Sequence, residues 1–132
     1  MLRIKRNVVQ AIVEHSKQEL PIEACGYLAS ENDIVSAHYE LTNIDKATDH
    51  FSMEPQEQFA AVKEMRSQGQ VLRAVYHSHP ETPARPSAED VRLAYDPDIS
   101  FVIISLATVE PQIKSFLVVR GIVSEELIEI IE

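Results

Sequence analysis

Cysteine is almost absent from this sequence: Cys25 is the only one among 132 residues. A single thiol cannot form an intramolecular disulfide, and it excludes a structural zinc site built from several cysteines. The fold must therefore rest on a hydrophobic core, and a chain of this length can bury roughly two-thirds of its unfolded surface. Because the length is too small for two independent cores, we expect a single domain over residues 1–132.

Long apolar runs are also missing. The N-terminal segment MLRIKRNVVQAIVEH contains none that would serve as a signal-peptide core or a membrane span. Lys and Arg number 12 against 21 Asp and Glu, which gives a formal net charge of −9, and the basic residues form no stripe. Such a surface repels a phosphate backbone. The sequence therefore predicts a cytoplasmic protein that binds neither membranes nor nucleic acid. Its net negative charge could serve to bind a partner with a basic face, or it could simply keep the protein soluble.

Hydrophobic periodicity predicts alternating strands and helices. Apolar runs or alternation predict strands at 2–5, 25–29, 34–41, 51–53, 71–76, 99–107, 113–119 and 122–131, the last of which could equally be helical. Helical spacing predicts helices from a cap at Asn7 to Pro21, from Pro55 to Gly69, and from Ser87 to near Pro97. We expect an α+β fold, α/β-like in its three layers, with a mixed central β-sheet flanked by helices.

The segment His77-Ser78-His79 ends a predicted buried strand just before a loop with three prolines. Alternate side chains of a strand lie on one face about 6.6 Å apart, so the two imidazoles can converge on one ion. Asp90 follows one turn into the next predicted helix. Two His and one carboxylate leave a fourth position for water, which is the open arrangement of a catalytic zinc rather than the closed one of a structural zinc.

Hydrolysis of an amide also needs a base and an oxyanion donor. Glu23 precedes the strand that starts at Cys25, and Ser87 has a hydroxyl close to Asp90 in sequence. Each residue has an ordinary interpretation as well. Ser87 and Asp90 form a capping-box pattern, a lone His pair is usually unrelated to a metal, and Glu23 after a proline is usually solvated. Their joint occurrence is what favours a catalytic site.

The string His77-Ser78-His79-Pro80, followed by Ser87 and Asp90 at their spacing, resembles the signature of the JAMM (MPN+) metalloproteases. The segment Glu23 to Leu28 is similar to the family's upstream glutamate segment in its short prokaryotic members, and residues 43–55 are similar to its intervening loop. The resemblance covers nearly the whole chain. A glycine common before the motif is replaced here by the run Arg73 to Tyr76, which affects packing and no ligand.

The resemblance implies roles for five residues. His77, His79 and Asp90 would be zinc ligands, Glu23 the general acid and base, and Ser87 the oxyanion donor. It also implies an MPN-type domain and a zinc peptidase or isopeptidase. The implied substrate is a ubiquitin-like sulfur-carrier protein, cleaved after its C-terminal Gly-Gly tail to release an amino acid or an extension. A non-catalytic scaffold and a metal-dependent hydrolase of small amides remain as alternatives.

Other proteins with paired histidines fit less well. An amidohydrolase barrel needs about 250 residues, and a cupin-like barrel needs many glycine-rich turns, whereas this chain has three glycines. Cys25 could approach the metal or be a small buried thiol, and we favour the thiol. His50 is expected at the surface or at the border of a substrate groove. The acids of the last segment, Glu125, Glu126 and Glu129, are expected to form a solvated face.

Overall fold

A computed structural model describes all 132 residues of the chain. Strands and helices follow one another in the order β1 (Leu2–Lys5), α1 (Arg6–Gln18), β2 (Cys25–Glu31), β3 (Ile34–Leu41), α2 (Pro55–Ser67), β4 (Val71–His79), α3 (Ala88–Arg92), β5 (Ser100–Ser105), β6 (Gln112–Val119), β7 (Ile122–Glu126) and β8 (Ile128–Ile131). The strands at 34–41 and 2–5 have the predicted bounds. None of the helices combines the length and the apolar character that crossing a membrane requires.

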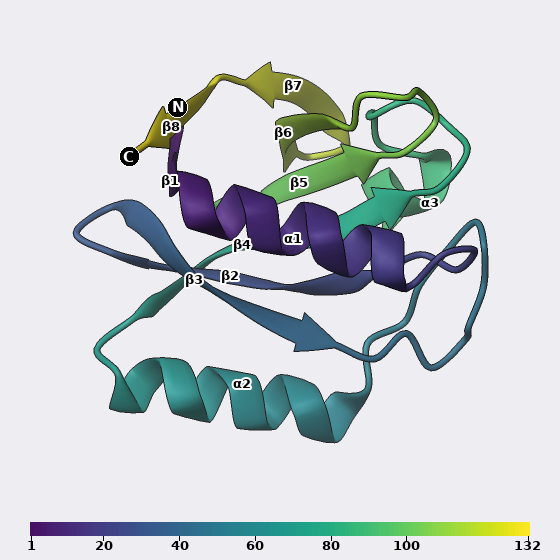
Figure 1. Cartoon of the computed structure of the whole chain (residues 1–132). Coiled ribbons are helices and arrows are strands. Elements are labelled where there is room, and N and C mark those ends of the chain that lie inside the picture. Colours follow the sequence, from purple (N-terminus) through teal and green to yellow (C-terminus); the bar gives the residue numbers. More distant parts are fainter.

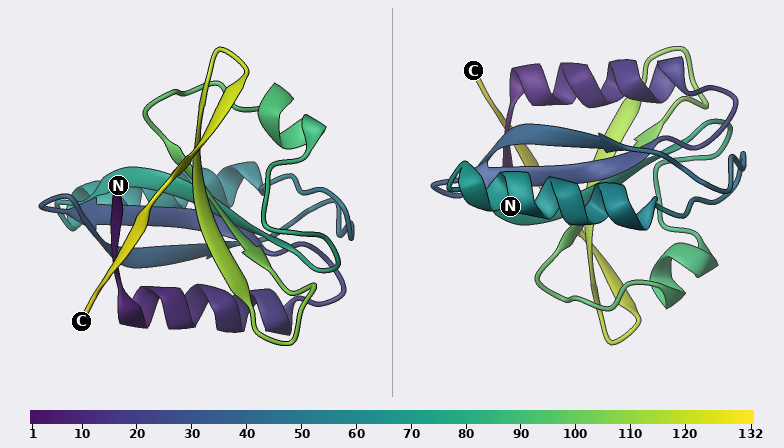
Figure 2. Two further views of the ribbon diagram at one scale, coloured as in Figure 1. Left: turned by 90° about the horizontal axis from the view of Figure 1, so that it is seen from above. Right: turned by 90° about the horizontal axis from the view of Figure 1, so that it is seen from below.

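The strands form one eight-stranded sheet in the order β7-β6-β5-β4-β2-β3-β1-β8 (Figure 1). Its pairings are mixed: β4 runs parallel to β5 but antiparallel to β2, which lies on its other side. Helices α1 and α2 lie on opposite sides of the strands between them (Figure 2), and each contributes to a separate core cluster. The predicted mixed sheet with flanking helices is therefore confirmed.

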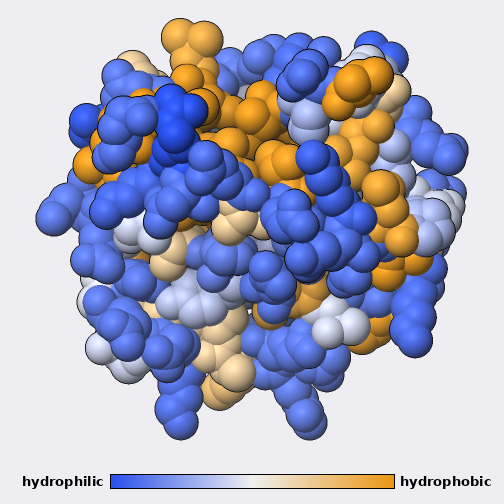
Figure 3. Space-filling model, in the orientation of Figure 1, coloured by the Kyte–Doolittle hydropathy of each residue, from blue (hydrophilic) through white to orange (hydrophobic).

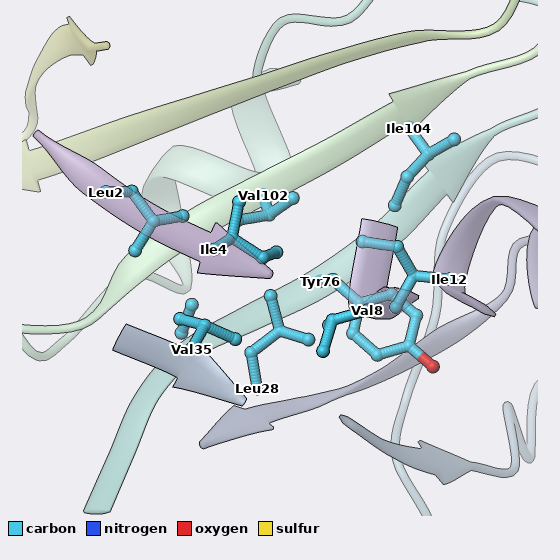
Figure 4. Packing of buried hydrophobic residues seen from close by; sticks show 10 residues of the cluster. Leu2, Ile4, Val8, Ile12, Leu28, Val35, Tyr76, Val102 and Ile104 are labelled. Carbon is cyan, nitrogen blue, oxygen red and sulfur yellow. The ribbon is translucent and has the colours of Figure 1, made fainter. Parts of the chain in front are cut away.

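The larger core lies between α1 and the sheet (Figure 4). Val8 and Ile12, one turn apart on α1, face alternate side chains of the strands, such as Leu28 and Tyr76. All of these side chains are almost completely buried. The helix buries apolar residues spaced three and four apart, and each strand buries every second residue. The side chains selected by these two periods pack together in one layer between α1 and the sheet.

The other face of the sheet packs against α2. Cys25, Tyr27 and Leu41 form a second cluster there with Ala61 and Met65 of the helix. Because alternate residues of β4 share a face, Val75 packs against this cluster and His77 and His79 follow it on the same side. The metal motif therefore lies on the α2 face, beyond the end of the second core cluster.

The last segment differs from the predicted simple hairpin. It is extended, but it divides at Leu127, so that β7 pairs with β6 while β8 pairs with β1 at the other edge of the sheet. The carbonyl of Leu127 accepts a hydrogen bond from the Leu2 N–H at 2.8 Å. One stretch of chain thereby connects the two edges, as its arch over the top of Figure 1 shows.

Glu126 contradicts the predicted solvated acidic face. Its carboxylate is buried and accepts hydrogen bonds from the hydroxyls of Ser100 and Ser115, while Glu125 and Glu129 are exposed as expected. The reason is register: β7 places residue 126 opposite Ser115, where the hydroxyls satisfy the carboxylate. Several apolar residues of this region are exposed instead, and Figure 3 shows hydrophobic groups gathered in the upper half of that view. Exposed ones include Ile122, Val123, Leu127 and Ile130.

Three further predictions of secondary structure are wrong. Asn7 lies inside α1, because β1 runs directly into the helix and Lys5 becomes its extended cap. Residues 51–53 form no strand but a single bridge between Met53 and Asn43. The third helix is only Ala88–Arg92, with Ser87 as its cap, since residues 93–99 turn back toward β5.

Gly26 is required by a close approach between strands. A Cβ atom there would overlap the Tyr39 carbonyl oxygen and the ring of buried Tyr76. We expect Gly26→Ala to lower the free energy of unfolding by about 3 kcal/mol, at the upper end of the usual overpacking cost. Urea unfolding measures this. Gly69→Ala is the control, because Gly69 has open space and only a φ of +70° to strain, which costs about 1 kcal/mol. If Gly26→Ala costs no more than the control, the predicted clash does not exist.

Candidate metal centre and adjoining groove

The two histidines of the motif are held in the middle of the sheet. His77 and His79 are buried at the end of β4, between β2 and β5. The ring of Phe51 stacks on the ring of His77, with centroids 4.7 Å apart and planes inclined by 28°. Strand pairing therefore places both side chains, and stacking on Phe51 also fixes the ring of His77.

Three potential ligand atoms converge in front of these rings. The His77 Nε2 lies 3.2 Å from the His79 Nε2 and 3.1 Å from the Asp90 Oδ2, and the His79 Nε2 lies 3.4 Å from the same oxygen. Ligands at about 2.0–2.1 Å from a tetrahedral zinc ion are separated by about 3.3 Å. The nitrogen and oxygen donors therefore match a zinc site in type and in spacing, and the predicted ligand trio is brought together.

Asp90 reaches the histidines through the cap of α3. The Ser87 N–H donates to the Asp90 Oδ2 at 2.8 Å, and the Asp90 N–H donates to the Ser87 Oγ at 3.0 Å. The capping-box interpretation is thus confirmed, and it coexists with the metal arrangement because Asp90 uses the same carboxylate for both. Burial opposes ionisation of this carboxyl, but hydrogen bonds from His77 and His79 hold its pKa well below the usual range.

The proline-containing loop fixes the orientation of His79. The His79 Nδ1 lies 2.9 Å from the Pro83 carbonyl oxygen, which can only accept, so Nδ1 donates to it and Nε2 is the nitrogen that faces His77 and Asp90. Ala84 anchors the loop by packing against Ile103 and Phe116. The role of Pro83 could not be predicted from the sequence, because a backbone oxygen leaves no signal in a residue pattern.

Glu23 is placed by hydrogen bonds of its backbone: its N–H donates to the Ala47 carbonyl at 2.9 Å, and the peptide groups that follow it are bound by Ser78 and Asn43. The Ser78 Oγ accepts from the Ala24 N–H at 2.8 Å, and the Ser78 N–H donates to the Ala24 carbonyl at 3.0 Å. The Asn43 amide donates to the Glu23 carbonyl at 3.1 Å. Ser78 and Asn43 were both missed as positioning residues. The only available signals were the place of Ser78 between the two histidines and that of Asn43 in the loop with the family resemblance.

The carboxyl group of Glu23 is buried rather than solvated, which overturns its ordinary interpretation. Only 4% of the residue is exposed, and its Oε1 has no hydrogen-bond partner. Burial raises its pKa to about 7, with His79 opposing this and the negative charge of Asp90 adding to it. A carboxyl that titrates near neutrality, close to the ligand trio, can both accept and return a proton.

Cys25 is a buried thiol, as predicted. It pairs with His77 across the strands, yet its Sγ donates to the Leu41 carbonyl at 3.6 Å and it is not part of the ligand trio. Burial raises the pKa of this thiol to about 12. Because metals bind the thiolate, a thiol that keeps its proton is a poor ligand.

A groove of about 540 Å³ adjoins the ligand trio on the α2 face. It has an apolar wall formed by residues that include Phe51, Met53, Leu72, Val75, Leu93 and Phe101. From His77 back to Leu72 the strand rises about 16 Å, enough for several residues of extended peptide. His50 lines the mouth of the groove, and its hydrogen bond with Asp49 raises the pKa of its imidazole. His15 and His38 do not line it.

Comparison with known proteins identifies a family and named relatives. Residues 5–118 match the family described as prokaryotic homologues of the JAB domain. The CysO-cysteine peptidase of Mycobacterium tuberculosis is 34% identical over an alignment that covers 100% of this chain and 92% of the relative. A probable TtuB-protein conjugate cleaving protease of Thermus thermophilus is 28% identical over 71% of this chain and 64% of its own length.

A solved structure agrees over the full chain. The solution structure of a protein from Desulfitobacterium hafniense superposes with a TM-score of 0.91 at 47% identity, covering 100% of this chain and 94% of the other. Together with the family match, this confirms the fold type that the resemblance implied.

The buried carboxyl of Glu23 makes the metal-free protein less stable as pH rises. Its pKa is about 4.5 when unfolded and about 7 when folded, so the folded state holds the proton more tightly. Stability is therefore lost between these values, by about 3 kcal/mol in all. We expect Glu23→Gln, measured by urea unfolding in chelator, to gain stability over the wild type by more at pH 8 than at pH 5. An equal difference at both pH values would contradict the raised pKa.

Proposed function

The chain belongs to the family of prokaryotic homologues of the JAB domain and is a peptidase, and we propose that it uses zinc to cleave conjugates of ubiquitin-like sulfur-carrier proteins after their C-terminal Gly-Gly. One observation carries this proposal: three ligand atoms of the right kind converge at zinc spacing beside a buried, unpartnered glutamate.

His77, His79 and Asp90 would hold the zinc ion. A bound zinc ion supplies Lewis acidity, which polarises the scissile carbonyl and makes water acidic enough to serve as a nucleophile near neutral pH. Asp90 contributes the negative charge that partly neutralises the cation, and its cap contact with Ser87 keeps the carboxylate aimed at the histidines. Two neutral imidazoles and one carboxylate leave one coordination position open for the reaction.

Glu23 would carry the proton. Its carboxylate accepts a proton from the attacking water and then returns it to the amine that leaves, which a group with a pKa of about 7 can do in both directions. The backbone is held in place for this, because Ser78 and Asn43 bind the peptide group that follows Glu23 and the Ala47 carbonyl accepts from the Glu23 N–H.

Ser87 would stabilise the oxyanion. Its oxygen already accepts from the Asp90 N–H, while its hydroxyl hydrogen has no protein acceptor. That hydrogen remains free to donate to the negative charge that develops on the carbonyl oxygen. The cap interaction orients the hydroxyl, so the structural role and the proposed catalytic role support each other.

Two features support a protein tail as the substrate. The groove is mostly apolar and is lined by β4 from Leu72 to His77, which suits an extended chain better than a small amide. The names of the two relatives refer to CysO–cysteine and to a TtuB–protein conjugate. Both relatives are described as peptidases, which argues against a non-catalytic scaffold. The requirement for Gly-Gly before the scissile bond is what the family resemblance implies. It also suits the site, because glycine has no side chain and can pass closest to a buried metal.

Metal content and activity of single variants test the assignment. We expect about one zinc per chain in the wild type and in Glu23→Gln, and much less in His77→Ala, because only the last loses a ligand. Glu23→Gln should hydrolyse a Gly-Gly-extended carrier at least about a hundredfold more slowly. Zinc is counted by elemental analysis and hydrolysis by mass spectrometry. His50→Gln is the control and should keep zinc.

Ser87 is tested separately because it also caps α3. Ser87→Ala should retain zinc but lower kcat about a hundredfold, whereas Ser87→Thr, which keeps both hydroxyl and cap, should recover most of it. Full activity in Glu23→Gln or Ser87→Ala would refute the role given to that residue. A wild-type protein that binds no zinc and hydrolyses nothing after reconstitution would refute the proposed function itself.

A further inference from the structure

The loop between β3 and α2 is closed at its base and binds Glu23 near its tip. At the base, the Ile44 N–H donates to the Ser52 carbonyl at 2.9 Å. Near the tip, the Ala47 carbonyl accepts from the Glu23 N–H at 2.9 Å. The position of Glu23 therefore depends on how the tip of this loop is held.

The side chain of His50 joins the two limbs of the loop. Its Nδ1 lies 2.9 Å from the Asp49 Oδ1, and its Nε2 lies 3.3 Å from the Asp45 Oδ2. These two acids are the ends of a short arc, residues 45–49, which has Ala47 at its centre. We call it the Ala47 arc. One imidazole contacts both ends of the arc, so it sets the position of the carbonyl at the centre.

A buried side chain at the base of the loop supports the same arrangement. Asn43 is 1% exposed, and its amide donates to the carbonyls of Glu23 and His50, each at 3.1 Å. Its Oδ1 accepts from the Asp45 N–H at 3.2 Å. The backbone at His50 and at Asp45 is thus anchored beside Glu23, and the contact between these two side chains closes the arc.

The charges of the arc depend on His50. The hydrogen bond with Asp49 raises the pKa of its imidazole, and a protonated imidazole donates from both nitrogens. Without it, Asp45 and Asp49 are unpaired like charges on one short loop and repel each other. Burial is the main cause of the raised pKa of Glu23, but the negative charge of Asp49 adds to it and His50 opposes it.

We propose that His50 is a positioning residue for Glu23. Its imidazole, held between Asp45 and Asp49, keeps the Ala47 arc closed. The closed arc keeps the Ala47 carbonyl on the Glu23 N–H. This rests on the proposed function, because it takes Glu23 as the residue that carries the proton. When the arc opens, the backbone of Glu23 loses one of its hydrogen bonds, and its carboxyl is less often in place for proton transfer.

A direct contact between His50 and the substrate would have a different kinetic effect. His50 lines the mouth of the groove, so a contact with the tail would appear in KM. The placement of the proton carrier affects the chemical step, so it appears in kcat. Because ion pairs at exposed positions contribute modestly, we expect an effect of about fivefold.

Amide hydrogen exchange, followed by NMR, measures the Ala47 arc directly and needs neither zinc nor substrate. In His50→Ala we expect the Glu23 N–H to exchange about fivefold faster than in the wild type. The Ile44 N–H, bonded at the base of the loop, should stay within about twofold. An unchanged Glu23 N–H would refute the proposal. Equal acceleration of both amides would refute it too, because His50 would then support the whole loop.

Kinetics of the zinc-loaded protein test the consequence, with CysO extended by a C-terminal cysteine as the probe. His50→Ala should keep its zinc, lower kcat about fivefold and leave KM within about twofold. Asp45→Ala should do the same, and the double variant should be no slower than either single variant, because the two side chains act through one contact. His50→Arg, which keeps the charge and several donors, should recover kcat to within about twofold.

His38→Ala is the matched control. The His38 Nε2 lies 3.1 Å from the Glu40 Oε2, a contact of the same kind as that of His50 with Asp45. This pair lies on β3, on the face of the sheet that α1 covers, because the alternate residues of β3 pack in the cluster under α2. The control should leave kcat, KM and the exchange of the Glu23 N–H within about twofold.

The possible results separate the two proposals. If the wild type cleaves the probe and His50→Ala changes KM alone, His50 contacts the substrate, and its positioning role is refuted while the proposed function stands. If the effects of His50→Ala and Asp45→Ala multiply in the double variant, the two residues act separately, which also refutes the role. If the zinc-loaded wild type does not cleave the probe, the proposed function fails, and the exchange of the Glu23 N–H still decides whether His50 holds Glu23.

Discussion

The pairing of β2 with β4 is the interaction on which the candidate site depends. Cys25 lies opposite His77, and Ser78 bonds to both the N–H and the carbonyl of Ala24. The same contact thus holds the metal-ligand strand and the residue next to Glu23. Gly26 permits the approach, since any side chain there would overlap Tyr76. Because β2 and β4 are central strands, the core on both faces stabilises this pairing and with it the site.

The site concentrates features that are unfavourable in a metal-free protein. Glu23 has a buried oxygen without a partner, the His77 Nδ1 is also unpartnered, and three potential ligand atoms converge within 4.8 Å of one another. The proposed zinc ion would bind these three atoms, and the proposed water would give Glu23 a partner. The hydrophobic layers under α1 and α2 offset the cost of holding these groups in place, as is usual where a site is organised in advance of its ligand.

The sequence predicted the bounds of a strand correctly where hydrophobic alternation and the residues on either side indicated the same limits, as at 2–5 and 34–41. The prediction was wrong where contacts with residues distant in the chain decide the structure. Asn7 is a good cap by type, but β1 enters the helix directly. Glu126 was predicted to be solvated, but the register of β7 places its carboxylate against the hydroxyls of Ser100 and Ser115. The last segment could not be divided at Leu127 from its own residues, because the two halves pair with strands from opposite ends of the chain.

The sequence by itself determined which residues form the candidate site. The spacing of His77, His79, Ser87 and Asp90 is a local property of one strand, one loop and one helix cap. Glu23 was identified through the family resemblance. Only the tertiary structure decided their environment. The separation of the ligand atoms depends on where α3 places Asp90, and the raised pKa of Glu23 comes from burial by segments far along the chain. The groove likewise exists only because β4, α2 and residues 93–99 meet on one face of the sheet.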